Sequence, residues 1–389
     1  MTCNNENSTK LDAVKLLASE GFDGLQSVME LLVNEAMLLE REKHLGVSAY
    51  ERSRERVDYA NGFKPKQLKT RIGKLDLQVP QVRKGDFYPG LLERGLRSEQ
   101  ALRLAIAEMY VQGVTTRKVA AITQELCGFN VTSDEVSRLT KHLDEQLDAW
   151  RNRPLGCYPY LIVDARYEKV RYDKTVVNVA VLVAYGVDTE GRRRILGVST
   201  SLSEAEVHWR DFLQQLISRG LHGVKLIVSD AHAGLQAARI TTFPSVPWQR
   251  CQFHLQQNAQ QYVSKQHQKK GVAVDIRAIF NSASIDDALL QLKRVVKKYQ
   301  ETMPKLSHWL ADNIEQGLTV MSVTPTEHWR RLRTSNMAER VNKEIKRRTR
   351  ISGLFPNTDS CLRLVSAVLI EIDEAWDDSY MYLDMSVNL

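Results

Sequence analysis

The stretch Leu161-Ile162-Val163-Asp164-Ala165 is an apolar run that contains one acid, and it sets the interpretation of the middle of the chain. Asp is unfavourable in strands, so Asp164 calls for an explanation. An exposed strand position or a salt bridge to a nearby Arg would be a purely structural one. Asp230 follows the apolar run Leu226-Ile227-Val228-Ser229 and could simply cap the next helix. Because acids at the carboxyl ends of strands also line the crevice where ligands bind, we predict that both carboxylates are functional.

A series of predicted strands surrounds these two acids. Strands are expected at Leu161–Ala165, Val176–Tyr185 and Arg193–Thr200, followed by a helix at Glu204–Arg219 and a strand at Val224–Ser229. The second of these strands is almost entirely apolar, as in a strand buried on both faces. Three strands, a helix and a strand, with acids on the first and fourth strands, is the order of ribonuclease H-like folds.

A helical stretch separates the second acid from a third. Residues 253–320 are predicted to be mostly helical, with a capping signal at Ser284-Ile285-Asp286-Asp287. They lie between Asp230 and Glu339, so we interpret them as an insertion into the core. Glu339 then falls on a helix that returns to the core.

Glu339 heads a basic helix. The spacing Asn336-x-x-Glu339 is also that of a capping box, in which the Glu side chain reaches back to the backbone. The distribution of the following residues weakens that alternative. One side of the helix collects Glu339, Lys343, Lys346, Arg347 and Arg350, and the other collects Met337, Val341 and Ile345. Such a helix would hold a metal ion at one end and a DNA backbone along the rest.

Three convergent carboxylates would supply a two-metal site. Mg²⁺ prefers hard oxygen ligands, so Asp164, Asp230 and Glu339 are the predicted ligands of two Mg²⁺ ions, for which Mn²⁺ is expected to substitute. Two ions about 3.5–4 Å apart would activate the attacking oxygen and stabilise the leaving one in an in-line displacement at phosphorus. Water as the nucleophile would cleave a DNA strand, and a 3′-hydroxyl would join two strands.

Cys251 and His254 form a Cys-x-x-His pair that suggests zinc. A structural zinc site needs four ligands, usually from two such pairs, and the sequence contains no second pair. We therefore predict that Cys251 and His254 support the catalytic site, with His254 near the scissile phosphate.

The first part of the chain is predicted to be mainly helical, with one basic β-hairpin. Apolar residues recur at helical spacing over residues 10–45. Residues 66–82 alternate as strands do, with a turn at Gly73-Lys74. Residues 98–150 return to helix in three pieces, namely Ser98–Gln112, a second helix capped by Thr115 or Thr116 and ending at Cys127, and a third capped by Ser133.

These three helices have two interpretations. A helix, a glycine-containing turn and a helix are typical of a helix-turn-helix, but an ordinary helical bundle fits the pattern equally well. As a helix-turn-helix, the third helix would bury Val136, Leu139, Leu143 and Leu147 and would expose Ser137, Arg138, Lys141 and His142.

Composition limits the class of protein. A chain of 389 residues exceeds one ordinary domain, and 43% hydrophobic with 26% charged residues is typical of a globular protein. The five cysteines are odd in number and include no Cys-x-x-Cys pair, which argues for a reducing compartment. The N-terminus is polar, and the longest apolar stretch, Val176–Val187, is too short to span a bilayer. We therefore expect a cytoplasmic protein without membrane attachment.

Positive charge is concentrated in two places. The net charge is +7, residues 330–350 contain nine Arg or Lys against two Glu, and residues 64–84 contain seven against one Asp. A single basic cluster is about as often a solvated surface as a binding site. Two clusters, one of which encloses Glu339, indicate nucleic-acid binding. The predicted DNA-binding residues are Lys66, Lys69, Arg71, Arg138, Lys141, Arg340, Lys343, Lys346, Arg347 and Arg350.

Longer motifs run from end to end of the chain. They include Tyr50-Glu51-Arg52, Gly113-Val114-Thr115-Thr116-Arg117, Ser229-Asp230-Ala231-His232-Ala233-Gly234-Leu235, Gln249-Arg250-Cys251-x-x-His254 and Thr334-Ser335-Asn336-x-x-Glu339-x-x-Asn342. In these motifs the chain resembles the mutator-type transposases of bacterial insertion sequences, within the Asp-Asp-Glu recombinase superfamily. The third and fourth motifs are specific. Small departures from the family pattern, at Ala231, Ser335 and Ala338, touch no expected ligand.

The resemblance implies a ribonuclease H-like catalytic domain interrupted by a helical insertion, with Asp164, Asp230 and Glu339 as metal ligands. It also implies that the N-terminal region binds the terminal inverted repeats of the element. The expected partners are these repeats, target DNA and further copies of the chain in a homodimer or higher multimer. The expected location is the bacterial cytoplasm, in association with the nucleoid when DNA is bound.

The expected organisation has five segments. They are an N-terminal helical region with the hairpin (1–95), a helix-turn-helix-like DNA-binding region (96–152), the first part of the core (153–255), the helical insertion (256–327) and the completion of the core with the Glu339 helix and a C-terminal helix (328–389). The expected fold class is α/β, a ribonuclease H-like catalytic core with a helical insertion, preceded by a mainly helical DNA-binding N-terminal region.

The expected function is that of a transposase, an Asp-Asp-Glu polynucleotidyl transferase that cleaves DNA strands and transfers them. The main alternative is a domesticated, catalytically inactive DNA-binding regulator, and the three intact acids argue against it. A structure-specific nuclease of the same fold is a second alternative, which would not need a dedicated end-binding region.

Overall fold

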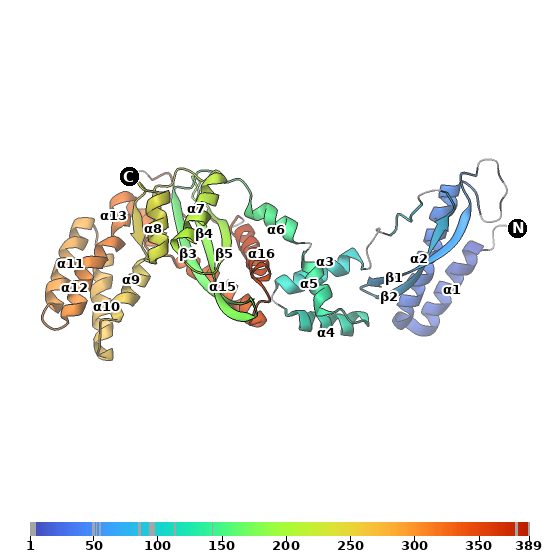
Figure 1. Ribbon diagram of the computed structural model, residues 1–389, viewed down its shortest axis with the longest axis horizontal. Helices are drawn as coiled ribbons and strands as arrows, with labels where there is room; N and C mark the ends of the chain where they lie inside the picture. Colours follow the sequence, from blue (N-terminus) through green and yellow to red (C-terminus); the bar gives the residue numbers. More distant parts are fainter. Residues whose placement is uncertain are drawn as a thin grey trace. The chain divides into compact units, whose positions relative to one another are not determined.

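The computed structural model of the protein describes residues 5–48, 51, 53, 56–84, 87–92, 98–112, 114–141, 143–377 and 380–387 (Figure 1). The chain divides into two units, Met1–His142 and Leu143–Leu389. Of the sequence motifs, Tyr50, Arg52 and Gly113 lie outside the described residues, as does His142. Over the described ranges, every helix is too short or too polar to cross a membrane.

The first unit begins with two helices where one was predicted. α1 (Asn5–Glu20) and α2 (Leu25–Leu45) are separated by the 3₁₀ turn η1 (Gly21–Gly24). Gly21 has a φ of 60°, a left-handed conformation that ends α1 and that residues with a side chain rarely adopt. The prediction of one continuous helix over residues 10–45 was therefore wrong.

The predicted hairpin is confirmed. β1 (Ala60–Thr70) and β2 (Gly73–Val82) pair antiparallel, with Thr70 opposite Gly73. The connection is therefore Arg71-Ile72, just before the predicted turn, and the Thr70 hydroxyl closes it by donating to the Gly73 carbonyl at 2.8 Å. Alternate residues of β2, namely Leu75, Leu77 and Val79, pack with Met37 of α2. The alternation in the sequence thus reflects burial on one face.

Three short helices complete the first unit. α3 (Gln100–Val111), α4 (Thr116–Cys127) and α5 (Ser133–Lys141) pack around Ile106, Val119 and Val136. Thr115 caps α4, as predicted, because its hydroxyl accepts from the Lys118 amide. At α5 the hydroxyl that accepts, from the Glu135 amide, belongs to Thr132, which precedes the predicted cap Ser133.

The predicted third helix does not continue to residue 150. A separate helix, α6 (Asp144–Arg151), belongs to the second unit, although the sequence assigned it to the 96–152 segment. The physical reason is an ion pair in which the Arg363 guanidinium holds both oxygens of Asp144 at 2.6 and 2.8 Å. Arg151 also donates to the Ser366 hydroxyl at 2.8 Å. Both partners lie on the C-terminal helix, α16 (Thr358–Asp377).

The second unit is built on a five-stranded mixed sheet (Figure 1). Its strands are β3 (Tyr160–Tyr172), β4 (Thr175–Val187), β5 (Arg193–Ser201), β6 (Leu226–Ser229) and β7 (Trp248–Arg250). The order is β5-β4-β3-β6-β7, in which β5, β4 and β3 are antiparallel neighbours and β6 and β7 run parallel to β3. The predicted order of three strands, a helix and a strand is confirmed, and β7 is an addition to it.

Helices cover both faces of this sheet. α7 (Glu206–Ser218) and α8 (Ala233–Thr242) pack on one face against alternate strand residues such as Leu161 and Leu182. Residues of the opposite parity face α16 and α15 (Asn336–Ser352); for example, Tyr185 lies against Trp376. Burial on both sides explains why the β4 sequence is an almost uninterrupted apolar run.

The predicted helical stretch between the second and third acids is confirmed. It consists of α9 (Gln252–Gln260), α10 (Gln266–Phe280), α11 (Ile285–Tyr299), α12 (Pro304–Asn313), η2 (Ile314–Gly317), α13 (Thr319–Val323) and α14 (Thr326–Leu332). Ser284 caps α11, as predicted, because its hydroxyl accepts from the Asp287 amide at 3.1 Å. The chain then returns to the sheet through α15.

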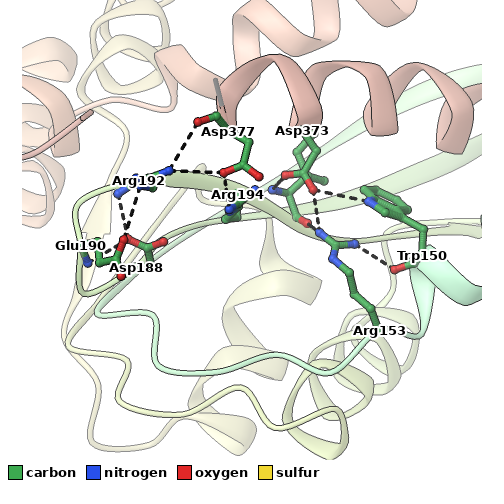
Figure 2. A network of polar contacts seen from close by, with 9 residues as sticks. Trp150, Arg153, Asp188, Glu190, Arg192, Arg194, Asp373 and Asp377 are labelled. Atoms are coloured by element: carbon green, nitrogen blue, oxygen red, sulfur yellow. Dashed lines mark hydrogen bonds and ion pairs between the residues drawn. The ribbon is translucent and has the colours of Figure 1, made fainter. Parts of the chain in front are cut away.

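A polar network ties α6, β5 and α16 together (Figure 2). Asp373 is 7% exposed, and its carboxylate accepts from the Ile195 amide at 2.7 Å, from the Arg153 guanidinium at 2.9 Å and from the Trp150 indole at 3.4 Å. One turn later, Asp377 pairs with Arg194 at 2.6 Å. These contacts fix the last helix of the chain against the edge strand of the sheet.

Candidate functional site

The register of the parallel strands brings three polar residues to one level. Ile162 pairs with Val228, and Val228 pairs with Gln249. Asp164, Asp230 and Cys251 each follow one of these residues by two positions. They are therefore neighbours across β3, β6 and β7, at the edge where β6 and β7 end. In sheets with parallel strands this edge is where ligands bind.

Asp164 is a buried acid, with only 9% of its surface exposed. Its Oδ2 accepts from the side-chain amide of Asn342 at 2.7 Å. Burial and the charge of Asp230 raise the pKa of Asp164 to about 7, against the opposing effects of His254 and the Asn342 hydrogen bond. Among the described side chains it has no ion-pair partner, because nearby Arg166 pairs with Glu168 instead. Neither structural explanation for Asp164 therefore holds.

Asp230 is half-buried and does not cap the following helix. Its Oδ1 accepts from the His232 amide at 3.3 Å, whereas α8 begins at Ala233 without a side-chain cap. The helix-capping alternative is therefore wrong.

Cys251 lies between β6 and the start of α15. Its thiol is fully buried, and Sγ accepts from both the amide and the hydroxyl of Ser335 at 3.3 Å. Its own amide donates to the Ser229 carbonyl at 2.7 Å. Cys251 thus bridges the residue before Asp230 and the residue before the Glu339 helix.

His254 stands next to Cys251 and to both acids. Burial alone would raise the pKa of the Cys251 thiol, but its interactions with His254 and Ser335 outweigh burial and lower it. Conversely, Cys251, Asp164 and Asp230 together raise the pKa of His254 against the effect of its partial burial. The raised pKa favours the protonated imidazolium of His254, which lies close to the two carboxylates.

Glu339 lies in the first turn of α15 and is half-buried. No capping box forms, because no side chain caps the backbone amides at the start of α15. Asn342, one turn further on, contacts Asp164, so α15 runs beside β3. Across the described part of the chain, however, no three His, Cys, Asp or Glu side chains lie close enough together to hold a metal ion. Asp164 and Asp230 interact with each other, but among the described residues they do not form with Glu339 a group that could hold a metal ion.

The donor chemistry fits a divalent cation. Carboxylate oxygens are the ligands that Mg²⁺ prefers. Burial and the neighbouring charge of Asp230 disfavour the ionised form of Asp164, and a bound cation would offset both effects.

α15 is amphipathic, as predicted. Met337, Val341 and Ile345 are buried. The basic side chains on the other side are exposed, namely Arg340, Lys343, Lys346, Arg347 and Arg350. Arg347 pairs with Glu344 at 2.6 Å, so part of its charge is engaged within the helix.

Comparison with known proteins identifies the family. A sequence model of Mutator-family transposases matches residues 2–379. The chain belongs to the Mutator family of transposases. It is 51% identical over 376 residues to the transposase for insertion sequence element IS406 of Burkholderia multivorans, a match that covers 96% of this chain and 97% of that protein. It is 43% identical to the transposase for insertion sequence element ISRM5 of Rhizobium meliloti, over 98% and 95% of the two chains.

Among solved structures, a simian T-cell lymphotropic virus intasome in complex with a PP2A regulatory subunit matches 60% of this chain and 74% of its own. The identity is 14% and the TM-score is 0.18, which is too low to bear on the fold of this family member.

In the first unit of this Mutator-family chain, the predicted DNA-binding residues differ in their surroundings. Arg138 is exposed on α5. Lys69 pairs with Glu135 at 2.8 Å, Arg71 pairs with Glu99 at 3.2 Å, and Lys66 donates to the Tyr88 hydroxyl at 2.7 Å. The side chains of Lys141 and Ser137 lie outside the described part of the structure.

Two residues at the acidic edge were not predicted. Asn342 could have been found, because its spacing of three residues from Glu339 places both near the same side of α15. Glu204 was assigned to a helix, but α7 begins only at Glu206. Its carboxylate instead points into the protein, 3.8 Å from His232. No local pattern in the sequence signals that position.

Proposed function

We propose that this transposase binds the terminal inverted repeats of an insertion sequence and catalyses Mg²⁺-dependent strand cleavage and strand transfer by a two-metal mechanism. The observation that carries the proposal is the pair Asp164 and Asp230 at the carboxyl edge of the parallel strands, beside the basic helix headed by Glu339. The sheet order β5-β4-β3-β6-β7 supports a ribonuclease H-like core. Function as a multimer in the bacterial cytoplasm, associated with the nucleoid when DNA is bound, belongs to the same proposal.

The residues around the acids have distinct roles in this mechanism. Bound Mg²⁺ would activate the attacking oxygen and stabilise the leaving one. Asn342 orients the Asp164 carboxylate by its hydrogen bond. His254 supplies positive charge near the scissile phosphate. Glu339 would complete the ligand set if its side chain rotated toward the two aspartates, and no side-chain cap at the start of α15 holds it back.

A basic cavity in the first unit supports binding of the DNA ends. Its volume is about 1170 Å³, and it lies between the hairpin and α5. The basic residues that line it are Lys64, Lys66, Lys69, Lys74, Arg103 and Arg138, and Glu135 is the one acid among the described lining residues. Because Lys69 already neutralises Glu135, the remaining positive charge is available to a phosphate backbone.

Substitution of Arg138 by Ala is expected to weaken binding of a duplex carrying the element's end and to reduce the slope of log K against log salt by about 1. Lys64→Ala should act in the same way. Lys118→Ala is the matched control, because Lys118 is exposed on α4 and lies outside the cavity lining. Fluorescence anisotropy at several salt concentrations measures both quantities. Equal slopes for all three variants would place the DNA elsewhere.

Strand transfer tests the proposed function as a whole. A labelled duplex bearing the element's own ends is incubated with the protein and Mg²⁺, and joined products are expected. EDTA should abolish joining and leave end binding intact, because the metal serves the chemistry and the basic surfaces serve binding. End binding without cleavage in Mg²⁺ or Mn²⁺ would support the regulator instead. Cleavage without joining would support the nuclease.

A further inference from the structure

The loop that contains Glu204 presses directly on the start of α8. Gly234 lies in the first turn of that helix, and a Cβ atom there would come within 2.1 Å of the Glu204 carbonyl oxygen and 2.9 Å of the Glu206 amide nitrogen. Only a glycine leaves room for this approach. Glu204 is therefore held at a fixed place beside the segment that follows Asp230.

The Glu204 side chain touches the same segment a second time. The residue is only 9% exposed, and its Oε2 lies 3.8 Å from Nδ1 of His232. That Nδ1 is buried and has no hydrogen-bond partner among the described residues, although His232 as a side chain is 41% exposed. The side chains of Tyr167 and Trp209 also interact with the carboxylate. A buried carboxylate of this kind is stable only with such partners.

His232 in turn holds Asp230. Its backbone amide donates to Asp230 Oδ1 at 3.3 Å, a contact that limits how the Asp230 carboxylate can rotate. Contacts therefore lead from Glu204 to the His232 ring, and from the His232 backbone to Asp230. Glu204 is not a predicted metal ligand and does not belong to the sheet. Its buried carboxylate is instead the group that contacts the His232 ring.

We propose that Glu204 is a positioning residue of the catalytic site, which fixes His232 and thereby orients the Asp230 carboxylate for metal binding. The inference rests on the proposed two-metal function. Partners that orient metal ligands without touching the metal typically contribute 10–100-fold to metal affinity. Glu204 affects the affinity of the site for the metal, because it orients the Asp230 carboxylate and does not bind the metal itself.

Glu204→Gln keeps the size of the side chain and removes its charge. We expect the Mg²⁺ concentration that gives half-maximal strand cleavage to rise roughly tenfold, with the rate largely recovered at saturating Mg²⁺. Mn²⁺ binding to the DNA-free protein, measured by calorimetry, should weaken by a similar factor. Glu206→Gln is the matched control, because Glu206 is exposed two residues further on and pairs with Arg210 at the surface. It should leave both quantities unchanged.

His232→Gln tests the route of the effect and remains informative if Glu204→Gln folds poorly, since His232 is partly exposed. It should weaken Mn²⁺ binding about as much as Glu204→Gln, and the double variant should be no weaker than the worse single one. Additive losses, or unchanged Mn²⁺ binding in a folded Glu204→Gln protein, would overturn the proposal. Absence of saturable Mn²⁺ binding in the unmodified protein would instead overturn the two-metal function, and this inference with it.

Discussion

Replacement of Asp164 by Asn is expected to reduce strand transfer by at least about a thousandfold while leaving end binding intact. Metal ions at such sites contribute several kcal/mol to stabilisation of the transition state, and about 4 kcal/mol corresponds to a factor of roughly 10³ in rate. Asn has the same shape as Asp and can still accept from Asn342, so the loss would reflect the missing negative ligand. Single-turnover strand transfer on end-bearing DNA measures the rate.

The same substitution should stabilise the metal-free protein above neutral pH. Because the native pKa of Asp164 is about 7, against an ordinary value of 3.8, the folded protein binds this proton more tightly than the unfolded chain does. Ionisation therefore lowers the free energy of unfolding as pH rises from about 4 to 7, by up to about 4 kcal/mol. Above pH 7 Asp164 is ionised in the folded protein too, so its contribution to the free energy of unfolding changes no further.

Thermal unfolding in EDTA between pH 4 and pH 8 tests this prediction. Asp164→Asn should melt above the unmodified protein at pH 8 and close to it at pH 4. Asp211→Asn is the control, because it removes an exposed carboxylate from α7 in the same unit. Saturating Mg²⁺ should stabilise the unmodified protein more than Asp164→Asn. Equal pH dependence in all three proteins would mean that Asp164 ionises normally.

The sequence predicted the sheet well because burial leaves a strong local signal. β4 is covered on both faces, so its sequence is nearly continuous apolar residues. In β3, Asp164 is conspicuous as an acid that follows four buried residues. The continuous helix over residues 10–45 was wrong because apolar spacing continues on both sides of η1, and the glycines at its two ends were not given weight. β7 was missed because three residues are too few to show a period.

The site was predictable only in part, for a related reason. Asp230 follows the last residue of β6, and the register of the two strands brings Asp164, which lies within β3, to the same level. Asn342 and Glu204 owe their roles to tertiary contacts. Asn342 reaches Asp164 from α15, and Glu204 is fixed by the close approach of Gly234. How near Glu339 comes to the two aspartates depends on how α15 packs on the sheet, which residue types and spacing do not encode.

Removal of the Asp373 carboxylate is expected to give the second large effect, a loss of stability of about 3 kcal/mol for Asp373→Ala. Breaking a buried, hydrogen-bonded charge pair typically costs 3–5 kcal/mol, and the lower end applies because Arg153 keeps some solvent contact. The variant leaves the buried Ile195 amide without its acceptor and the Arg153 guanidinium without its counter-charge (Figure 2). Urea denaturation of the full chain, followed by tryptophan fluorescence, measures the loss.

Two variants on the same helix separate the causes. Asp377→Ala, one turn further on, removes a carboxylate that is 47% exposed and should cost at most about 1 kcal/mol, as surface ion pairs do. Asp373→Asn keeps an acceptor for the Ile195 amide and should recover part of the loss. Burial raises the pKa of Asp373 despite its hydrogen bonds, so its charge is expected to contribute less than those bonds. A cost for Asp373→Ala no larger than that for Asp377→Ala would mean that the network in Figure 2 does not anchor α16 to the sheet.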